Sequence, residues 1–191
     1  MRLPYVLGMA YIGVCLAAIA SAPRATALVH PDLTPFVTSE GSGGEWFRTI
    51  RPHCNPVEVE TRHEWSPPPD NFDGIAYSAA CYALAGYTNK ARTLLRNLPT
   101  DDQWRGAGVV FNVGHPVADA GNDRAASPIM ELVVEFWPNH YMALYHAGSA
   151  RFALGEHGPA TDYLERFLKE YPEEDGWVAA AESMLQAMDD S

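Results

Sequence analysis

Five polar residues with side chains suited to metal binding or acid–base chemistry lie between positions 115 and 140: His115, Asp119, Asn122, Asp123 and His140. Imidazole and carboxylate groups bind metal ions when three or four of them converge within a supporting shell. Their spacing does not show such convergence, and Asp and Asn are ordinary turn residues. We therefore assign no metal ligand and no catalytic residue, and keep a metal-dependent enzyme using residues 115–123 as an alternative.

A second group that could bind metal is His53, Cys54 and His63. A disulfide at Cys54 would remove its thiolate, which is the form that binds metal. The sequence has no nucleophile elbow, no phosphate-binding loop and no H-E-x-x-H motif. We expect a protein without a cofactor that is not an enzyme.

The composition limits the class of partner. The chain has 191 residues, 47% of them hydrophobic, which suits one domain or one small array with a buried core. Its 24 acidic residues outnumber the 13 basic ones, and no basic run occurs. Because phosphate binding needs clustered Lys and Arg, we expect no nucleic-acid partner.

The first 27 residues are typical of an export signal. Arg2 precedes an apolar run from Val6 to Ala20, and residues 25–27 form an A-x-A cleavage pattern. Residues 3–22 are also long enough to span a bilayer, so an uncleaved membrane anchor remains open. Either way, we expect the rest of the chain to be exported, in a periplasm or outside the cell.

Cleavage after residue 27 would leave two cysteines, Cys54 and Cys81. Two thiols in an oxidising compartment are most simply paired, so we predict a disulfide between them. The loop that it closes has roughly 27 residues, for which chain entropy gives about 3 kcal/mol of stabilisation.

Residues 28–71 are rich in Pro and Gly, and predict an irregular N-terminal arm. Within it, residues 45–51 predict a short helix, and the alternation in residues 57–61 predicts a half-buried strand. Trp46, Phe47 and Trp65 are costly to leave in water. We therefore expect the arm to pack along the rest of the chain as a cap.

Residues 141–174 predict a hairpin of two helices, and the rest of the chain is organised around it. Gly155 to Pro159 makes the turn, because glycine ends helices readily and proline is tolerated in a first turn. Small residues recur where the helices come close, and bulky apolar ones fill the space between them.

This spacing resembles a tetratricopeptide repeat. With Tyr141 as position 1, the matching residues are Leu144, Gly148, Gly155, Ala160, Leu164, Phe167 and Pro172 at positions 4, 8, 15, 20, 24, 27 and 32. Departures include Ala147 at position 7 and Arg151 at position 11, where the family has Leu and Tyr.

The same positions recur one repeat earlier, in residues 107–140, with Gly114 at position 8 and Gly121 at position 15. Because proline removes a helical hydrogen bond, His115-Pro116 predicts a helix that breaks. We expect this helix from about Asp102 to Gly114, an irregular loop to Ala125, and a second helix from Ser127 to Trp137. Ser127-Pro128 with Glu131 would cap its start.

Residues 72–106 supply another repeat, in which Pro99 comes four positions early. Its second helix should therefore end sooner, with residues 100–103 as a bridge. After residue 174, Asp175 can cap a last helix, which covers the exposed face of the last hairpin. The apolar stripe of that helix is Trp177, Ala181, Leu185 and Met188.

The fold class that we predict is all-α: a short tetratricopeptide-like solenoid of about three hairpins and a C-terminal capping helix over residues 72–191, preceded by the arm at 28–71. In the family, side chains of each first helix line a groove that binds peptides. The resemblance therefore implies the following partner-groove residues: Tyr77, Ala80, Leu84, Phe111, Asn112, His115, Met142, Tyr145, His146, Ser149 and Phe152.

This groove is aromatic and nearly uncharged, so we predict that it binds an apolar or extended segment, from a partner protein or from the arm itself. The resemblance implies an exported scaffold or adaptor for protein–protein interaction. The alternative is an accessory subunit of a membrane complex, anchored by residues 1–27.

Overall fold

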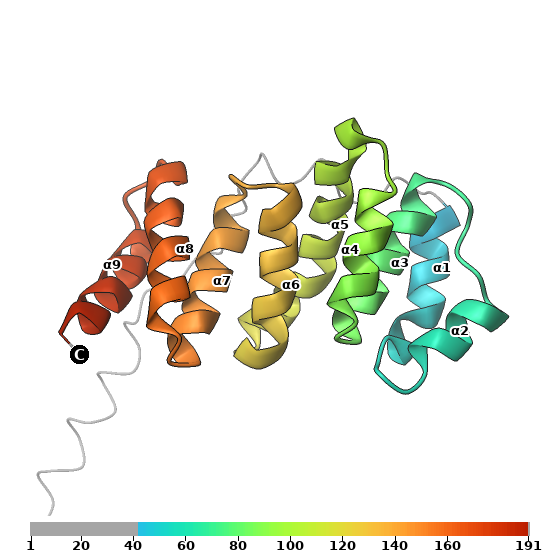
Figure 1. The fold of residues 1–191 in the computed structure, drawn as a ribbon, viewed down its shortest axis with the longest axis horizontal. Coiled ribbons are helices and arrows are strands. Elements are labelled where there is room, and N and C mark those ends of the chain that lie inside the picture. The colour runs from blue at the N-terminus through green and yellow to red at the C-terminus, as the bar shows by residue number, and fades with distance from the viewer. Residues whose placement is uncertain (1–41, 191) are drawn as a thin grey trace, which may run out of the picture. The chain divides into compact units, whose positions relative to one another are not determined.

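The computed structural model describes residues 42–190, and every regular element in this part of the chain is helical. The elements are α1 (Ser42–Ile50), η2 (Arg51–His53), α2 (Val59–Trp65), α3 (Phe72–Leu84), α4 (Thr88–Arg96), α5 (Thr100–Asp119), α6 (Asp123–Phe136), α7 (Tyr141–Ala153), α8 (His157–Glu170) and α9 (Gly176–Asp189) (Figure 1). The predicted signal or anchor at 1–27, and the arm up to residue 41, lie outside the described residues. None of the helices described combines the length and the apolar character needed to cross a membrane.

Three helical hairpins, α3–α4, α5–α6 and α7–α8, follow one another and are closed by α9. Each pair of helices packs together, α5 also packs on α3, α7 packs on α6, and α9 packs on α7 and α8. Figure 1 shows α3 to α9 side by side in chain order. The predicted fold class, a tetratricopeptide-like helical solenoid with a capping helix, is confirmed.

The three hairpins turn in the same way. Gly86, Gly121 and Gly155, at position 15 of each repeat, have φ angles of 81°, 68° and 75°. In each turn, the residue after the glycine donates its backbone N–H to the carbonyl five residues earlier, at 2.9, 3.2 and 2.9 Å. Glycine adopts this left-handed conformation at little cost, and the bond satisfies a carbonyl at the helix end. The repeat seen in the sequence is therefore also a repeat in the structure.

Glycine at position 8 lets the two helices of a hairpin approach closely. A Cβ atom on Gly148 would lie 2.7 Å from Cγ of Leu164 on α8, and one on Gly114 would lie 2.5 Å from Cγ2 of Ile129 on α6. Leu164 is fully buried, and Ile129 nearly so. These contacts set the spacing inside the second and third hairpins.

The expected break at Pro116 is wrong. Helix α5 runs without interruption from Thr100 to Asp119, with Pro116 inside it, so the predicted bridge at residues 100–103 is its first turn. Pro116 and Asn112, whose carbonyl loses its helical bond, are both exposed, so water can satisfy that carbonyl. The buried face of α5, which includes Val110 and Gly114, holds the helix against its neighbours.

The predicted start of the next helix is also wrong. Helix α6 begins at Asp123, so there is no loop to Ala125, and Pro128 lies inside the helix. Ser127 donates a hydrogen bond to Glu131 at 3.3 Å, but the two meet one turn apart inside α6 and do not cap its start. Packing of the buried face of α6 again outweighs the local preference of proline.

The described part of the arm contains three short helical elements, α1, η2 and α2, with a turn at residues 54–58 and a segment without helix or strand at residues 66–71. The short helix near residue 45 is confirmed as α1, with Trp46, Phe47 and Ile50 buried. The predicted strand at 57–61 is wrong, because α2 occupies this region. The Asn55 side chain accepts hydrogen bonds from the backbone N–H groups of residues 57 and 58, which turns the chain into a helix, whereas a lone strand would lack a pairing edge.

The arm is held on the first hairpin by three kinds of contact. Cys54 and Cys81 form the predicted disulfide, with Cα atoms 4.9 Å apart. Phe47 stacks on Tyr77 of α3, with ring centroids 5.1 Å apart. Nε2 of His63 and the hydroxyl of Ser78 on α3 share a hydrogen bond at 2.8 Å. Trp65 does not pack as expected, since 75% of its surface is exposed.

The last helix caps the third hairpin as predicted. The side chain of Asp175 accepts a hydrogen bond from the backbone N–H of Trp177 at 2.8 Å, which starts α9. Ala181 and Met188 are buried in the core.

Candidate protein-binding site

The predicted groove residues lie on α3, α5 and α7, the first helices of the three hairpins, and they differ in exposure. Asn112 is exposed, whereas Ala80, Phe111 and His146 are buried. The others are half-buried: Tyr77, Leu84, His115, Met142, Tyr145, Ser149 and Phe152. On the first hairpin, Phe47 of the arm stacks on the groove residue Tyr77.

Four of these residues and Trp177 form a continuous series of ring contacts, which we call the ring row: Phe111, His115, His146, Tyr145 and Trp177. In that order, successive ring centroids lie 4.9, 4.7, 5.5 and 4.8 Å apart. The row crosses from α5 through α7 to α9, because position 9 of the second repeat faces position 6 of the third. The sequence predicted Phe111, His115, His146 and Tyr145 as groove residues. It predicted Trp177 only as part of the apolar stripe of the last helix.

A second series of rings joins the row at Phe111. His140 lies 4.2 Å from Phe111, Trp137 lies 4.5 Å from His140, and Trp104 lies 5.2 Å from Trp137. Trp104 is 39% exposed, which is high for so large an apolar side chain. Trp and Tyr are enriched among the residues that contribute most to the binding energy of protein interfaces.

His140 has a structural role that the sequence did not reveal. It precedes α7 and accepts a hydrogen bond at Nδ1 from the backbone N–H of Ala143 at 3.2 Å, so it caps the helix. Burial, with smaller contributions from the nearby His115 and His146, lowers the pKa of His140 to about 4. The neutral ring that capping requires is therefore the form present at neutral pH.

His115 and Asp119 lie four residues apart, one turn of α5, and their side chains meet. His146 of α7 lies next to them. The Oδ1 atom of Asp119 lies 3.4 Å from Nε2 of His115 and 4.0 Å from Nε2 of His146. Burial, with a smaller contribution from His115, lowers the pKa of His146 to about 4. The group does not include His140 or Asp123, which we considered with it in the sequence. His146 was missing from that set because it lies a repeat away.

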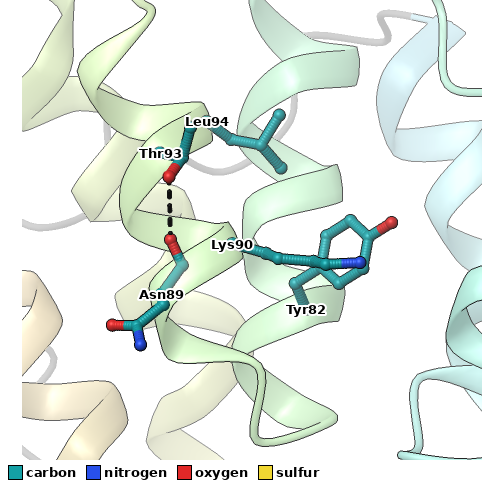
Figure 2. A pocket seen from close by; sticks show the side chains of 5 residues that line it. All are labelled: Tyr82, Asn89, Lys90, Thr93 and Leu94. Carbon is teal, nitrogen blue, oxygen red and sulfur yellow. Dashed lines mark hydrogen bonds between the residues drawn. The ribbon is translucent and has the colours of Figure 1, made fainter.

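Two surface pockets lie elsewhere. Figure 2 shows one of about 390 Å³ on α3 and α4, lined by Tyr82, Asn89, Lys90, Thr93 and Leu94. The Lys90 ammonium lies over the Tyr82 ring, 5.4 Å from its centroid, and pairs with Glu60 of the arm. The other pocket lies between α6 and the end of α7, around Ser127 and Leu154. Neither of the two is lined by a predicted groove residue.

Ion pairs connect the hairpins away from the ring row. Arg92 and Arg96 of α4 bind the two carboxylate oxygens of Glu135 on α6, at 2.6 and 2.7 Å. Burial alone would raise the pKa of Glu135, but these hydrogen bonds lower it. Arg151 of α7 pairs with Glu131 of α6 at 2.5 Å. This pair gives a physical reason for Arg151 at a position where the family has Tyr.

Residues 142–174 match the family model described as tetratricopeptide repeat. No curated protein and no solved structure matches the chain. The matched segment covers α7, α8 and the turn at Gly155, the same hairpin around which the register was built. The match and the all-helical hairpins in register show a tetratricopeptide-like helical solenoid, and the family match itself is confined to the third hairpin.

Proposed function

We propose that this protein is an exported scaffold that binds another protein through the face formed by α5, α7 and α9, and that it catalyses no reaction. Residues 142–174 match the tetratricopeptide repeat model, and such repeats generally mediate protein–protein interaction, which supports a binding function. The observation that carries the proposal for this face is the ring row, in which the half-buried rings of Tyr145 and Trp177 are in contact. Exposed Asn112 and half-buried Ser149 lie on the same helices as members of the row, α5 and α7.

The chemistry of the face indicates the class of ligand. The predicted groove residues on α5 and α7 include no Lys, Arg, Asp or Glu, although the chain as a whole has a net charge of −11. These groove residues offer no fixed positive charge that would select a terminal carboxylate, and the charged group beside them is the Asp119 carboxylate. We propose that the ligand is a protein segment with apolar or aromatic side chains, because these would bury area against the rings.

The first hairpin is a poorer place for such a ligand. Phe47 already covers one face of Tyr77, and the arm is fixed to α3 by the disulfide. The alternative in which the chain fills its own groove therefore applies to the first hairpin. We propose that binding takes place on the second and third hairpins.

Export is proposed from two features. The first is the apolar segment and A-x-A pattern within residues 1–27. The second is the disulfide, because paired cysteines are typical of oxidising compartments. The intact mass of the protein purified from its native source tests this: loss of about 27 residues supports an exported, cleaved protein. A full-length mass with recovery in membranes would favour the anchored accessory subunit.

Site-specific photo-crosslinking in the native envelope tests the binding face. A photoreactive residue replaces exposed Asn112 on α5, and a matched one replaces exposed Asn89 on α4, which lies away from the ring row. The proposal expects a discrete crosslinked partner from position 112 and little from position 89. We avoid Phe111, which is 5% exposed, because truncating it would disturb the core.

A competing variant completes the test. Ser149→Arg places a bulky cation on the half-buried surface of α7, and it should reduce the crosslink from position 112 at least tenfold. Equal yields from positions 112 and 89, or a yield at 112 that Ser149→Arg leaves unchanged, would contradict the proposal.

A further inference from the structure

We propose that His115, Asp119 and His146 form a binding site for a divalent metal ion such as Zn²⁺, which joins α5 of the second hairpin to α7 of the third. This site shares His115 and His146 with the ring row of the proposed binding face, but the argument for it does not use the proposed protein-binding function. It also differs from the residue set that sequence reasoning considered, because it needs His146 and does not use Asn122, Asp123 or His140.

The donor atoms are close enough to share one ion. One donor atom from each residue lies within 4.8 Å of the others, and the two contacts to Asp119 measure 3.4 and 4.0 Å. Ligand atoms bound to Zn²⁺ at its usual distances in a tetrahedral site are about 3.4 Å apart. The His115–Asp119 pair already has this spacing. Small side-chain rotations of His146 and Asp119 would bring the third donor into range.

The helix geometry explains why two of the donors meet. His115 and Asp119 are four residues apart on α5, so they lie on the same face of the helix one turn apart. This placement depends on α5 continuing through Pro116, the feature that the sequence analysis did not anticipate. A loop after Gly114 would have no reason to place the two side chains together.

A buried nitrogen without a hydrogen-bond partner points to a missing ligand. Nε2 of His146 and Nε2 of His115 are both buried and make no hydrogen bond within the described residues. The His146 side chain is only 8% exposed. A buried polar atom left without a partner costs roughly 1–3 kcal/mol. A metal ion would satisfy both nitrogens at once.

The surroundings fit a metal site with one open position. The His115 ring stacks on Phe111, and Tyr145 and Trp177 make T-shaped contacts with the His146 ring, so aromatic contacts hold both imidazoles. Asp119 is 54% exposed, which leaves a path from solvent to the site. Two imidazoles and one carboxylate suit Zn²⁺ or a similar transition-metal ion, and three protein ligands leave a fourth position for water.

Titration of the chelator-treated, purified protein with Zn²⁺ alone tests the proposal. We expect one equivalent to bind saturably and to raise Tm, since an ion that binds only the folded state stabilises it. The histidine ring nitrogens followed by NMR should show Nε2 of His115 and of His146 shifting together on addition of Zn²⁺, while those of His157 on α8 stay unchanged. Co²⁺ in place of Zn²⁺ should give visible absorption typical of a low-coordinate site.

Variants separate a built site from surface binding. Asp119→Asn keeps the size of an exposed side chain, so the metal-free protein should keep its Tm, yet its Zn²⁺ affinity should fall at least tenfold. His115→Gln should lose Zn²⁺ affinity to the same extent, with some loss of Tm because its ring stacks on Phe111. Asp123→Asn, four residues further on, is the matched control and should bind as the unchanged protein does. The proposal is overturned by an absence of saturable binding, by equal binding in Asp119→Asn and the unchanged protein, or by equal losses in Asp119→Asn and Asp123→Asn.

Discussion

The second and third hairpins have the same plan but differ in how their first helices are made. In both, a glycine at position 8 allows a close approach to the second helix, and a glycine at position 15 makes the turn. Helix α7 has 13 residues and a histidine cap, whereas α5 has 20 residues, no side-chain cap and an internal proline. Two unlike sequences therefore build the same unit.

This difference shows which residues determine the register. Pro116 and Pro128 lie inside α5 and α6, where proline is locally unfavourable, yet neither helix breaks. Contacts across the hairpin, such as Gly114 against Ile129, are the features that both hairpins share. The packing at position 8 and the turn at position 15 therefore determine the repeat. The two prolines destabilise their helices locally without breaking them.

The largest effect should come from filling position 8 of the third hairpin. In Gly148→Ala, the new Cβ would lie 2.7 and 2.8 Å from two side-chain carbons of Leu164 and 3.2 Å from its backbone nitrogen. Overpacking of this kind costs about 1–3 kcal/mol. We expect a loss near the upper end, measured by urea unfolding, because a backbone atom of α8 cannot easily move away.

Position 8 of the second hairpin gives the matched comparison. In Gly114→Ala, the closest atom is a single methyl carbon of Ile129, at 2.5 Å, and the other atoms near the new Cβ lie at 3.6 Å, so a shift of one side chain relieves the overlap without moving the backbone of α6. The loss should be about half that of Gly148→Ala. A double variant, Gly148→Ala with Leu164→Ala, should show strong non-additivity. Two neutral glycine variants would remove the argument for close packing.

Acid should weaken the third hairpin through His140. Its folded pKa of about 4 lies below the ordinary value of 6.5, so the unfolded chain binds the proton more readily. The stabilisation is present above pH 6.5 and is lost as the pH falls toward 4, by roughly 2 kcal/mol between pH 7 and pH 5.

His140→Asn tests this pH dependence, because asparagine can also cap a helix but does not titrate. Unfolding free energies at several pH values should show a loss that is smaller by roughly 2 kcal/mol in the variant than in the unchanged protein. His146 titrates in both proteins, so the difference isolates His140. Identical pH profiles would show that the cap at α7 has no such role.

Removing the internal proline of the second hairpin should stabilise it. Pro116→Ala restores one backbone N–H that can donate to the carbonyl of Asn112, and a net gain of about 1 kcal/mol is typical for one hydrogen bond. Pro159 of α8 is in a first turn, where proline is favourable, so Pro159→Ala should be neutral or slightly destabilising. The Tm of thermal unfolding should therefore rise in Pro116→Ala and stay unchanged or fall slightly in Pro159→Ala; a fall in Pro116→Ala would contradict this.

The smallest effect should come from the ion pair between the two hairpins. Glu131→Gln removes the charge that Arg151 binds, and both side chains are about one-quarter exposed. A partly exposed pair contributes about 0.5 kcal/mol, and less at high salt. Glu135→Gln, which acts between α4 and α6, is the comparison. If the loss of unfolding free energy in Glu131→Gln does not decrease with added salt, the side chain stabilises the protein by packing and not by its charge.

Much of the fold could be predicted from the sequence, because the repeat depends on a few positions with strong physical requirements. Glycines at positions 8 and 15 and apolar residues between them placed the third hairpin and its turn correctly, and Asp175 placed the cap of α9. The second hairpin was predicted less well, because a local rule about proline was applied without the packing that overrides it. In the arm, alternation at residues 57–61 predicted a strand where Asn55 starts a helix.

The candidate site could be predicted only in part. The family register placed His115 and His146 on first helices, but it did not show that position 9 of one repeat meets position 6 of the next. A list of possible metal ligands taken from one stretch of sequence could not include His146, which lies 31 residues after His115. Trp177 was predicted as part of the capping stripe, and its contact with Tyr145 depends on how α9 packs on α7.

The contact between the His115 and His146 rings tests the central claim most directly, because it requires both a continuous α5 and the stacking of the second hairpin on the third. Their ring centroids lie 4.7 Å apart. In the metal-free protein, we predict nuclear Overhauser effects between the two rings, together with helical carbon shifts through residues 115–119. Random-coil shifts over these residues, with no effect between the rings, would contradict the account.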